Sequence, residues 1–241
     1  MKKSNKILIF LTFLLTVCIG GFFIYTLDFY SADHNDAIEA LAGTEDIKIH
    51  TEENMVIFKP QNPVAGVVFY PGGKVECTAY SPLARQMAEN GILCVIAQMP
   101  FNLAVFDINA AEKPMEMFAD IEKWYMAGHS LGGSMAASFT ADNTDKITGL
   151  VLLASYSTAD LSESGIDVLS VYGDCDGVLN MEKYQQYYAN LPADTMEIVI
   201  HGGNHRQFGS YGLQKGDGTS LISADEQLQR TTDAIVAMIY N

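Results

Sequence analysis

The chain has 241 residues, of which 49% are hydrophobic and 18% are charged, and its formal net charge is −15 at pH 7. This length and apolar content are enough for one sizeable hydrophobic core and too small for two comfortable ones, so we expect one globular domain. An acidic surface repels the phosphate groups of nucleic acids and of anionic lipids. We therefore expect no nucleic-acid partner.

The N-terminal segment is set apart by its hydropathy. Residues 7–27 form an uncharged apolar run, which would be about 31 Å long as a helix and would match a bilayer core. Lys2, Lys3 and Lys6 precede this run, and the positive-inside rule places them in the cytoplasm and the rest of the chain outside. The run is longer than the apolar part of a typical signal peptide and has no obvious cleavage site. We favour an uncleaved single-pass anchor in the cell membrane over a protein secreted after signal cleavage.

Three regions follow from this division. Residues 1–27 are the cytoplasmic tip and transmembrane anchor, residues 28–44 are a polar linker running into a short helix, and residues 45–241 are the extracytoplasmic domain. Residues 1–27 contain three lysines and no acidic side chain, so residues 28–241 carry 11 basic and 29 acidic side chains, a net charge of −18. We interpret this charge mainly as a solubility feature.

Strand-like and helix-like runs alternate along the domain. An edge hairpin is predicted at residues 46–50 and 54–59, and buried strands are predicted at 65–70, 92–97, 123–127, 147–154, 168–172 and 196–200. Helices are predicted at residues 80–90, 109–121, 134–140, 181–190 and 223–240, the last with Ser223 as N-cap. This alternation predicts an α/β fold with a doubly wound, mostly parallel sheet. Functional groups of such sheets gather at the carboxyl ends of the strands.

The sequence G-H-S-L-G-G at residues 128–133 lies between a predicted strand and a predicted helix. Glycines on both sides of a serine permit a sharp turn that lifts the hydroxyl clear of the sheet and sets it beside the N-terminus of the helix. Such a turn is typical of a nucleophile elbow, although G-x-S-x-G also occurs by chance in glycine-rich turns. Ser130 is therefore the candidate nucleophile.

A serine nucleophile requires a base, most often histidine, and a carboxylate that orients the base. His129 adjoins the serine and would point away from it, which leaves His201 and His205 after the last strand of the predicted sheet. We prefer His205 because it lies farther into the loop. Asp174 and Asp176 both follow the strand at residues 168–172, and we prefer Asp176 for the same reason.

Acyl transfer also needs N–H donors for the developing oxyanion. We expect one from Leu131, directly after the nucleophile, and one from Gly73, in the glycine pair after the strand at residues 65–70. Side chains of nearby loops are candidates for substrate binding, namely Lys74, Tyr80, Asn102 and Phe208. The chain lacks sequence patterns of metal ligands or of a phosphate-binding loop, so we expect no metal and no cofactor.

With these residues in view, residues 45–241 resemble an α/β-hydrolase, and the compact branch related to dienelactone hydrolases more than the lidded lipases. The most specific segments are G-H-S-L-G-G at 128–133, Y-G-D-C-D-G-V at 172–178 and G-N-H-R-Q-F-G at 203–209. The chain departs from the pattern at Pro71, where many relatives have histidine. It also carries Ser130 where dienelactone hydrolases themselves carry cysteine, so their substrate is not inferred.

The resemblance implies a serine hydrolase that cleaves an ester, thioester or related acyl bond of a small-molecule substrate through an acyl-enzyme. An acyltransferase using the same three residues, and a non-catalytic surface-binding domain of the same fold, remain as alternatives. The oligomeric state is not predicted.

Three cysteines lie outside the apolar run. Cys94 falls inside a predicted strand and is interpreted as a buried small side chain. Cys77 and Cys175 fall in loops at the same end of the predicted sheet, and an exported protein can keep a disulfide. We leave open a disulfide between them or two free thiols.

Overall fold

The computed structural model describes residues 3–241, so Met1 and Lys2, which belong to the predicted cytoplasmic tip, lie outside the described residues. Eight strands form one sheet in the order β1-β2-β4-β3-β5-β6-β7-β8. The strands are β1 Ile47–Glu52, β2 Met55–Pro60, β3 Ala65–Tyr70, β4 Ile92–Ala97, β5 Trp124–His129, β6 Gly149–Leu153, β7 Asp167–Gly173 and β8 Met196–Ile200. β1 and β2 pair antiparallel, β2 pairs antiparallel with β4, and all other pairs are parallel. The predicted mostly parallel sheet with an edge hairpin is confirmed.

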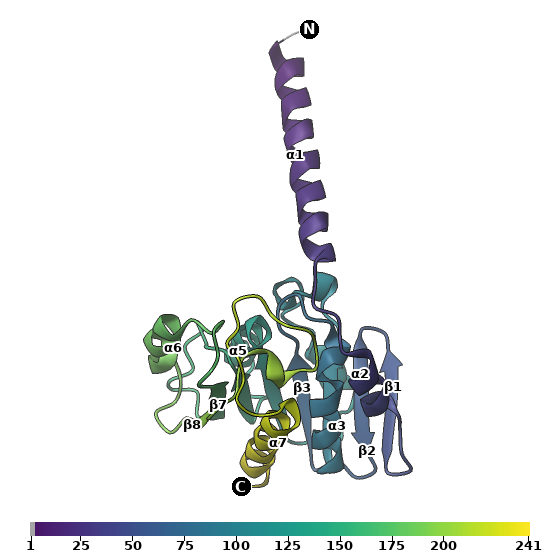
Figure 1. The fold of residues 1–241 in the computed structure, drawn as a ribbon, viewed down its shortest axis with the longest axis vertical. Helices are drawn as coiled ribbons and strands as arrows, with labels where there is room; N and C mark the ends of the chain where they lie inside the picture. The colour runs from purple at the N-terminus through teal and green to yellow at the C-terminus, as the bar shows by residue number, and fades with distance from the viewer. Residues whose placement is uncertain (1–2) are drawn as a thin grey trace.

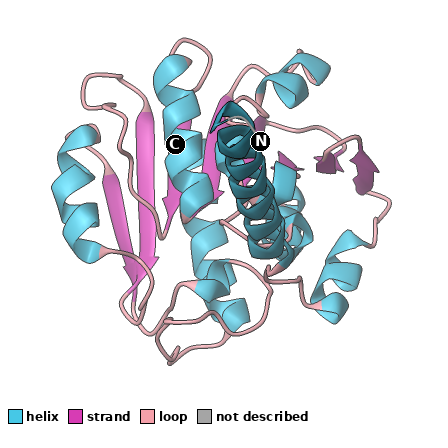
Figure 2. Cartoon of the chain, turned by 90° about the horizontal axis from the view of Figure 1, so that it is seen from above, coloured by secondary structure: helices cyan, strands magenta, loops and turns pink. Residues whose placement is uncertain are grey.

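The helices lie on both faces of the sheet (Figure 2). They are α1 Lys3–Leu27, α2 His34–Leu41, α3 Ser81–Glu89, α4 Glu112–Met117, α5 Leu131–Asp142, α6 Met181–Tyr187 and α7 Ala224–Tyr240. Short 3₁₀ turns are η1 Cys77–Tyr80, η2 Pro100–Asn102, η3 Ala104–Phe106, η4 Tyr188–Asn190 and η5 Arg206–Phe208. The Ser223 side chain accepts the Glu226 N–H at 3.1 Å, as the predicted cap requires.

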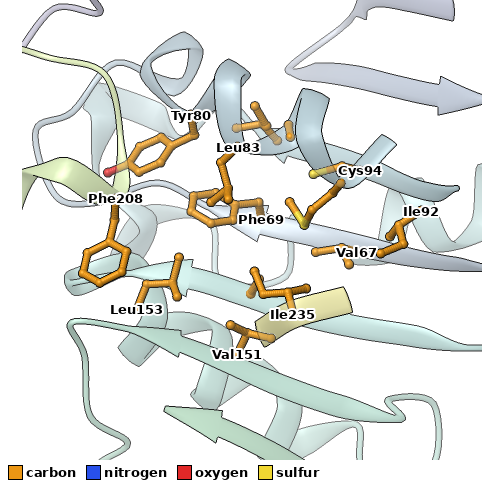
Figure 3. Packing of buried hydrophobic residues seen from close by; sticks show 14 of the residues in the cluster. Val67, Phe69, Tyr80, Leu83, Ile92, Cys94, Val151, Leu153, Phe208 and Ile235 are labelled. Carbon is orange, nitrogen blue, oxygen red and sulfur yellow. The ribbon is translucent and has the colours of Figure 1, made fainter. Parts of the chain in front are cut away.

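Alternate strand residues supply two separate hydrophobic cores. On one face, Val67 and Phe69 of β3 pack with α3 and α7 through Leu83 and Ile235 (Figure 3). On the other face, Val68 of β3 belongs to the core that contains the buried face of α5. Cys94 is fully buried in the first core, as expected from its place in a strand. Helices on both faces confirm the doubly wound arrangement.

One predicted helix is shorter in the structure, and the short helix predicted within the linker is present. The helix predicted at residues 109–121 is reduced to α4 Glu112–Met117, because Pro114 sits in its first turn and Phe118 ends it in a non-helical conformation. The linker at residues 28–44 contains α2, whose Ala37 and Ala40 are buried, and α2 contacts α3.

The helix α1 projects away from the domain (Figure 1). Its segment Asn5–Leu27 is long and apolar enough to cross a membrane, with a mean hydropathy of 2.7, and a signal sequence would share these properties. The window is not buried against the domain.

Candidate active site

Ser130 occupies the sharp turn between β5 and α5. Its backbone has φ 52° and ψ −123°, a conformation that non-glycine residues rarely adopt, and α5 begins at the next residue. Close backbone packing explains the neighbouring glycine, because a Cβ on Gly132 would lie 2.1 Å from the carbonyl oxygen of Tyr70. The G-x-S-x-G-G segment thus forms the strained strand-to-helix turn that its spacing predicts.

Asp176 and His205 form a buried pair in the loops after β7 and β8. Asp176 Oδ2 lies 2.8 Å from His205 Nδ1, and the two side chains are 2% and 1% exposed. The other carboxylate oxygen, Oδ1, accepts the N–H groups of Val178 at 2.7 Å and Leu179 at 2.8 Å. These bonds fix the carboxylate, which in turn fixes the orientation of the imidazole.

The alternative residues form a second Asp–His pair. His201 Nδ1 lies 3.0 Å from Asp174 Oδ2, and the hydrogen bonds from His201 and from the Gly202 N–H hold the pKa of Asp174 below its ordinary value. The His201 side chain is 85% exposed, and it does not line the cavity beside Ser130. The two pairs therefore differ in burial and in access to the serine.

A cavity of about 230 Å³ lies beside Ser130. Its lining residues are Ser130, Leu131, Ser134, Ala154, Ser155, Tyr156, Val178, Leu179, Asn180 and His205. Buried His205 Nε2 has no hydrogen-bond partner among the described residues, and Ser130 Oγ is not hydrogen-bonded to it. Nε2 of His205 is thus a buried nitrogen without a partner, on a residue that lines the same cavity as Ser130.

The glycine pair after β3 lies next to the serine turn. The Gly72 N–H is bonded to the Tyr80 hydroxyl at 3.0 Å, whereas the Gly73 N–H has no acceptor among the described residues. Leu131 is the first residue of α5, where backbone N–H groups lack partners within the helix. A Cβ on Gly73 would lie 2.9 Å from Leu131 Cδ2, so these two backbone segments are adjacent. Two unbonded amides are thus present beside Ser130.

His129 points into the protein rather than toward the cavity. Its Nδ1 lies 2.8 Å from the Tyr80 hydroxyl, and its ring lies 4.5 Å from the His205 ring between centroids. Because that hydroxyl accepts the Gly72 N–H, we assign its own proton to His129 Nδ1 and the imidazole proton to Nε2. Burial, with a smaller effect of His205, holds the pKa of His129 well below its ordinary value. A neutral imidazole thus packs against His205 from inside the protein.

Asp217 is a residue that the sequence analysis missed. Its carboxylate accepts the N–H groups of His205 at 3.1 Å and Arg206 at 2.9 Å, and that of Gly177 at 3.3 Å. It therefore joins the loops that carry His205 and Asp176. The available signal was an aspartate between two glycines in an otherwise featureless loop, a pattern too common to indicate this role.

The expected substrate-binding side chains do not line the cavity beside Ser130. For Tyr80 and Phe208 the expectation is wrong, because both side chains are fully buried in the core. Lys74 is turned toward the N-terminal segment, where its Nζ lies 2.9 Å from Asp28 Oδ2. Asn102 serves through its backbone carbonyl, which accepts the Lys74 N–H at 2.7 Å. These four residues belong to the loops around the site, and other residues line the cavity.

The structure has free thiols at Cys77 and Cys175. The strands β5 and β6 separate β3 from β7, which places the loops after β3 and β7 about 14 Å apart at ordinary strand spacing, too far for a disulfide. Cys77 is instead the first residue of η1 and is buried, and desolvation raises the pKa of its thiol to about 11. Of the two alternatives, the structure has the free thiols.

Comparisons with known proteins identify the same fold. One similar solved structure is a predicted CIB-like hydrolase from Thermoplasma acidophilum, with a TM-score of 0.57, 12% identity and coverage of 79% of this chain and 98% of the other. A second is TT1662 from Thermus thermophilus, with a TM-score of 0.61, 12% identity and coverage of 81% of this chain and 99% of the other. A third is Est1E from Butyrivibrio proteoclasticus, with a TM-score of 0.59, 14% identity and coverage of 82% of this chain and 100% of the other. At these identities the likeness shows the fold alone. No curated protein sequence matches significantly.

A family model supplies the assignment. The model described as the alpha/beta hydrolase family matches residues 66–229, which contain β3, the serine turn and both loops of the buried Asp–His pair. The chain belongs to the alpha/beta hydrolase family.

Proposed function

We propose that the protein is a serine hydrolase that cleaves an ester, thioester or related acyl bond through an acyl-enzyme. The observation that carries this proposal is the buried 2.8 Å pair of Asp176 and His205, in which His205 lines the same cavity as Ser130 and has its Nε2 unbonded. A buried histidine with one nitrogen oriented by a carboxylate and the other free beside a strained serine has the arrangement of a general base and its nucleophile.

In the first half-reaction Ser130 Oγ attacks the acyl carbonyl carbon while His205 Nε2 takes the serine proton. The Asp176 carboxylate stabilises the resulting imidazolium, and the amides of Gly73 and Leu131 donate to the oxyanion, each contributing about 3 kcal/mol. When the tetrahedral intermediate collapses, the bond to the leaving group breaks and His205 protonates that group. The acyl chain remains on Ser130.

In the second half-reaction a water molecule takes the place of the leaving group. His205 Nε2 removes a proton from this water as its oxygen attacks the acyl-enzyme carbonyl, and the same two amides stabilise the second oxyanion. Collapse returns the proton to Ser130 and releases the carboxylic acid. Every residue returns to its starting protonation state at the end of the cycle, so the free enzyme is regenerated.

The test is labelling by a fluorophosphonate probe together with hydrolysis of a water-soluble short-chain ester. We expect Ser130→Ala to lose labelling and to lower kcat/KM by about 10⁴-fold or more. The protein offers a matched control for the other two residues: His205→Gln and Asp176→Asn should lower the rate strongly, while His201→Gln and Asp174→Asn should leave it near the wild-type value. Wild-type protein that neither reacts with the probe nor hydrolyses esters would favour a binding domain.

We further propose that α1 is retained as a membrane anchor, with the hydrolase domain on the extracytoplasmic side. Contacts between the end of α1 and the domain support retention: the Phe22 ring lies 5.2 Å from that of Phe101, and Lys74 Nζ lies 4.4 Å from the centre of the Tyr25 ring. Signal cleavage would remove both contacts. Intact-mass measurement of the purified protein and protease accessibility in intact cells test the proposal, and a mass lacking residues 1–27 would contradict it.

A further inference from the structure

The loop after β4 carries an exposed apolar surface next to the membrane-length helix. Phe101, Val105 and Phe106, here called the apolar rim, are 45%, 43% and 51% exposed. The intervening Leu103 and Ala104 are buried, and residues 99–106 contain no charged side chain. A cluster of this kind on a small domain marks a surface that contacts a partner or a membrane.

Contacts with α1 show where the apolar rim lies along the axis of this helix. The Phe22 ring lies 5.2 Å from that of Phe101 and 5.7 Å from that of Phe106, and the Phe23 ring lies 6.2 Å from that of Phe101. Phe22 lies five residues before the end of α1 at Leu27, which is about 7.5 Å along the helix axis. If α1 spans a bilayer, the rim lies at a depth typical of interfacial apolar side chains.

The backbone of the loop is shaped to present these rings. Phe101 has φ 56°, in the left-handed region that bulky side chains rarely adopt. The neighbouring Asn102 has the same φ and is held by the Lys74 N–H, which donates to its carbonyl at 2.7 Å. A hydrogen bond to the loop that contains Gly73 therefore holds this strained backbone in place. The fold thus keeps the Phe101 ring exposed next to the site.

The juxtamembrane residues attach the site loops to the end of α1. Tyr30 pairs with Val75 beside the Gly73 loop, and the Tyr30 hydroxyl accepts the Lys215 N–H at 3.3 Å in the loop that carries Asp217. Ala32 pairs with Tyr211 of the same loop. The end of the domain from which α1 rises is thus the end that carries the serine turn and the loops around it (Figure 1).

We propose that the catalytic end of the domain lies against the bilayer with the apolar rim inserted, and that Ser130 acts on acyl esters of lipids dissolved in that leaflet. This inference rests on the proposed hydrolase activity and on retention of α1. A Cβ on Gly73 would lie 3.8 Å from Leu103 Cδ2, so the rim loop borders the proposed oxyanion site directly. The cavity of about 230 Å³ is smaller than sites that enclose a drug-sized ligand. It fits the reacting acyl group, and the remainder of a lipid stays in the membrane.

Depth-dependent fluorescence quenching tests the insertion without reference to activity. The full chain is reconstituted in phosphatidylcholine vesicles with and without bromine on the acyl chains, as the variants F106W and V64W. Val64 is a matched control because it is 51% exposed and directly precedes β3, at the end of the parallel strands opposite to the rim. The native Trp124 is buried and gives a common background. We expect brominated lipid to quench the F106W variant and not the V64W variant, and equal quenching of both would overturn the insertion.

Rates on two esters test the substrate class. For V105D and V64D we compare hydrolysis of an ester dissolved in the vesicles with hydrolysis of a water-soluble short-chain ester. A charge in place of the inserted Val105 should lower the ratio of the two rates about tenfold, and V64D should leave it unchanged. An unchanged ratio in V105D overturns the proposal. Wild-type protein inactive on both esters contradicts the hydrolase function instead, while the quenching result still decides the position of the rim.

Discussion

At the scale of single residues, the Asp176–His205 pair depends on side chains that do not line the cavity beside Ser130. Asp217 accepts three backbone N–H groups from the two loops that carry His205 and Asp176. Hydrogen bonds to a charged acceptor are about twice as strong as neutral ones, so one carboxylate can hold the two loops in a fixed position relative to each other. His129 adds a contact between its ring and that of His205 from inside the core.

Replacing Asp217 should therefore impair turnover more than binding. In Asp217→Ala the N–H groups of His205, Arg206 and Gly177 lose their acceptor, and the resulting shift of His205 should lower kcat about 10- to 100-fold with KM nearly unchanged. Asp217→Asn keeps one acceptor oxygen and should recover part of the rate. Asp160, an exposed aspartate that bonds only Ser162, is the matched control. Steady-state kinetics of the three variants decide the question, and a normal kcat in D217A would exclude the positioning role.

His129 predicts a pH dependence of stability. Its pKa in the folded state lies well below the ordinary value because it is buried, so between about pH 6.5 and that lower pKa the unfolded chain binds a proton that the folded chain does not. The free energy of unfolding should then fall as the pH falls below about 6.5, and His129 should contribute at most about 1.4 kcal/mol per pH unit to this fall. Above about pH 6.5, His129 should make no contribution to the pH dependence.

The matched variant is His129→Asn, whose side-chain oxygen can still accept from Tyr80 and does not titrate. Denaturant unfolding of both proteins from pH 8 to pH 5 isolates the contribution of His129, because the other groups cancel in the difference. We expect the advantage of the wild type over H129N to shrink below pH 6.5. A difference that stays constant over this range would mean that His129 protonates normally in the folded protein.

At the scale of elements, the junction of β5 and α5 is the most demanding part of the fold. A Cβ on Gly132 would meet the carbonyl oxygens of Tyr70 and Pro71 at 2.1 Å and 2.3 Å, and both are backbone atoms that cannot rotate away. Gly132→Ala should push α5 away from β3, with a cost of about 1–3 kcal/mol or more, and should displace the Leu131 amide relative to Ser130. We expect a lower Tm and slower fluorophosphonate labelling. Gly212→Ala is the control, because a Cβ there meets nothing within 4 Å.

The elements themselves were largely predictable, and the reason is periodicity. Strands buried on both faces appear as continuous apolar runs, so β3, β4 and β6 were found from the sequence. The helix expected at residues 109–121 was too long because its apolar spacing persists where Pro114 and local turns limit the backbone to α4. Ser130, Asp176 and His205 were nominated because their roles require fixed places after strands.

What the sequence did not provide was the direction of side chains in the connecting loops. Tyr80 and Phe208 lie in the 3₁₀ turns η1 and η5 of loops that follow strands, where cavity residues are expected, yet both side chains are buried in the core. The contact of Asp217 with His205 joins loops whose relation depends on the whole sheet, and no local pattern encodes it. Loop conformation is set by tertiary packing, so the places of Ser130, Asp176 and His205 in the fold could be predicted from the sequence, whereas the lining of the cavity could not.

At the scale of the whole molecule, an apolar helix is attached to a strongly acidic domain. Residues 28–241 carry a net charge of −18, acidic Asp28 and Glu76 lie near the end of α1, and Asp107 directly follows the apolar rim in sequence. The charge and the apolar rim therefore act in opposite directions at a membrane: the rim favours insertion, and the charge opposes approach to an anionic surface. A neutral leaflet is the environment in which both features are compatible.

This balance gives a prediction that ionic strength can test. At about 10 mM salt the screening length is about 30 Å, so repulsion from anionic vesicles acts on the whole domain, whereas at about 0.15 M it falls to about 8 Å. With the proposed hydrolase in vesicles of increasing anionic lipid content, the rate on a vesicle-dissolved ester should fall about threefold or more at low salt and recover as salt is added. The rate on a water-soluble neutral ester should not change with salt or lipid charge, so a comparison of the two rates separates contact with the membrane from the chemical step.

Asp107→Asn removes one charge directly beside the rim and should weaken the dependence of the lipid-ester rate on anionic lipid. If the lipid-ester rate is the same in neutral and anionic vesicles at low salt, the acidic surface has no part in how the catalytic end meets the membrane, and the charge serves solubility alone.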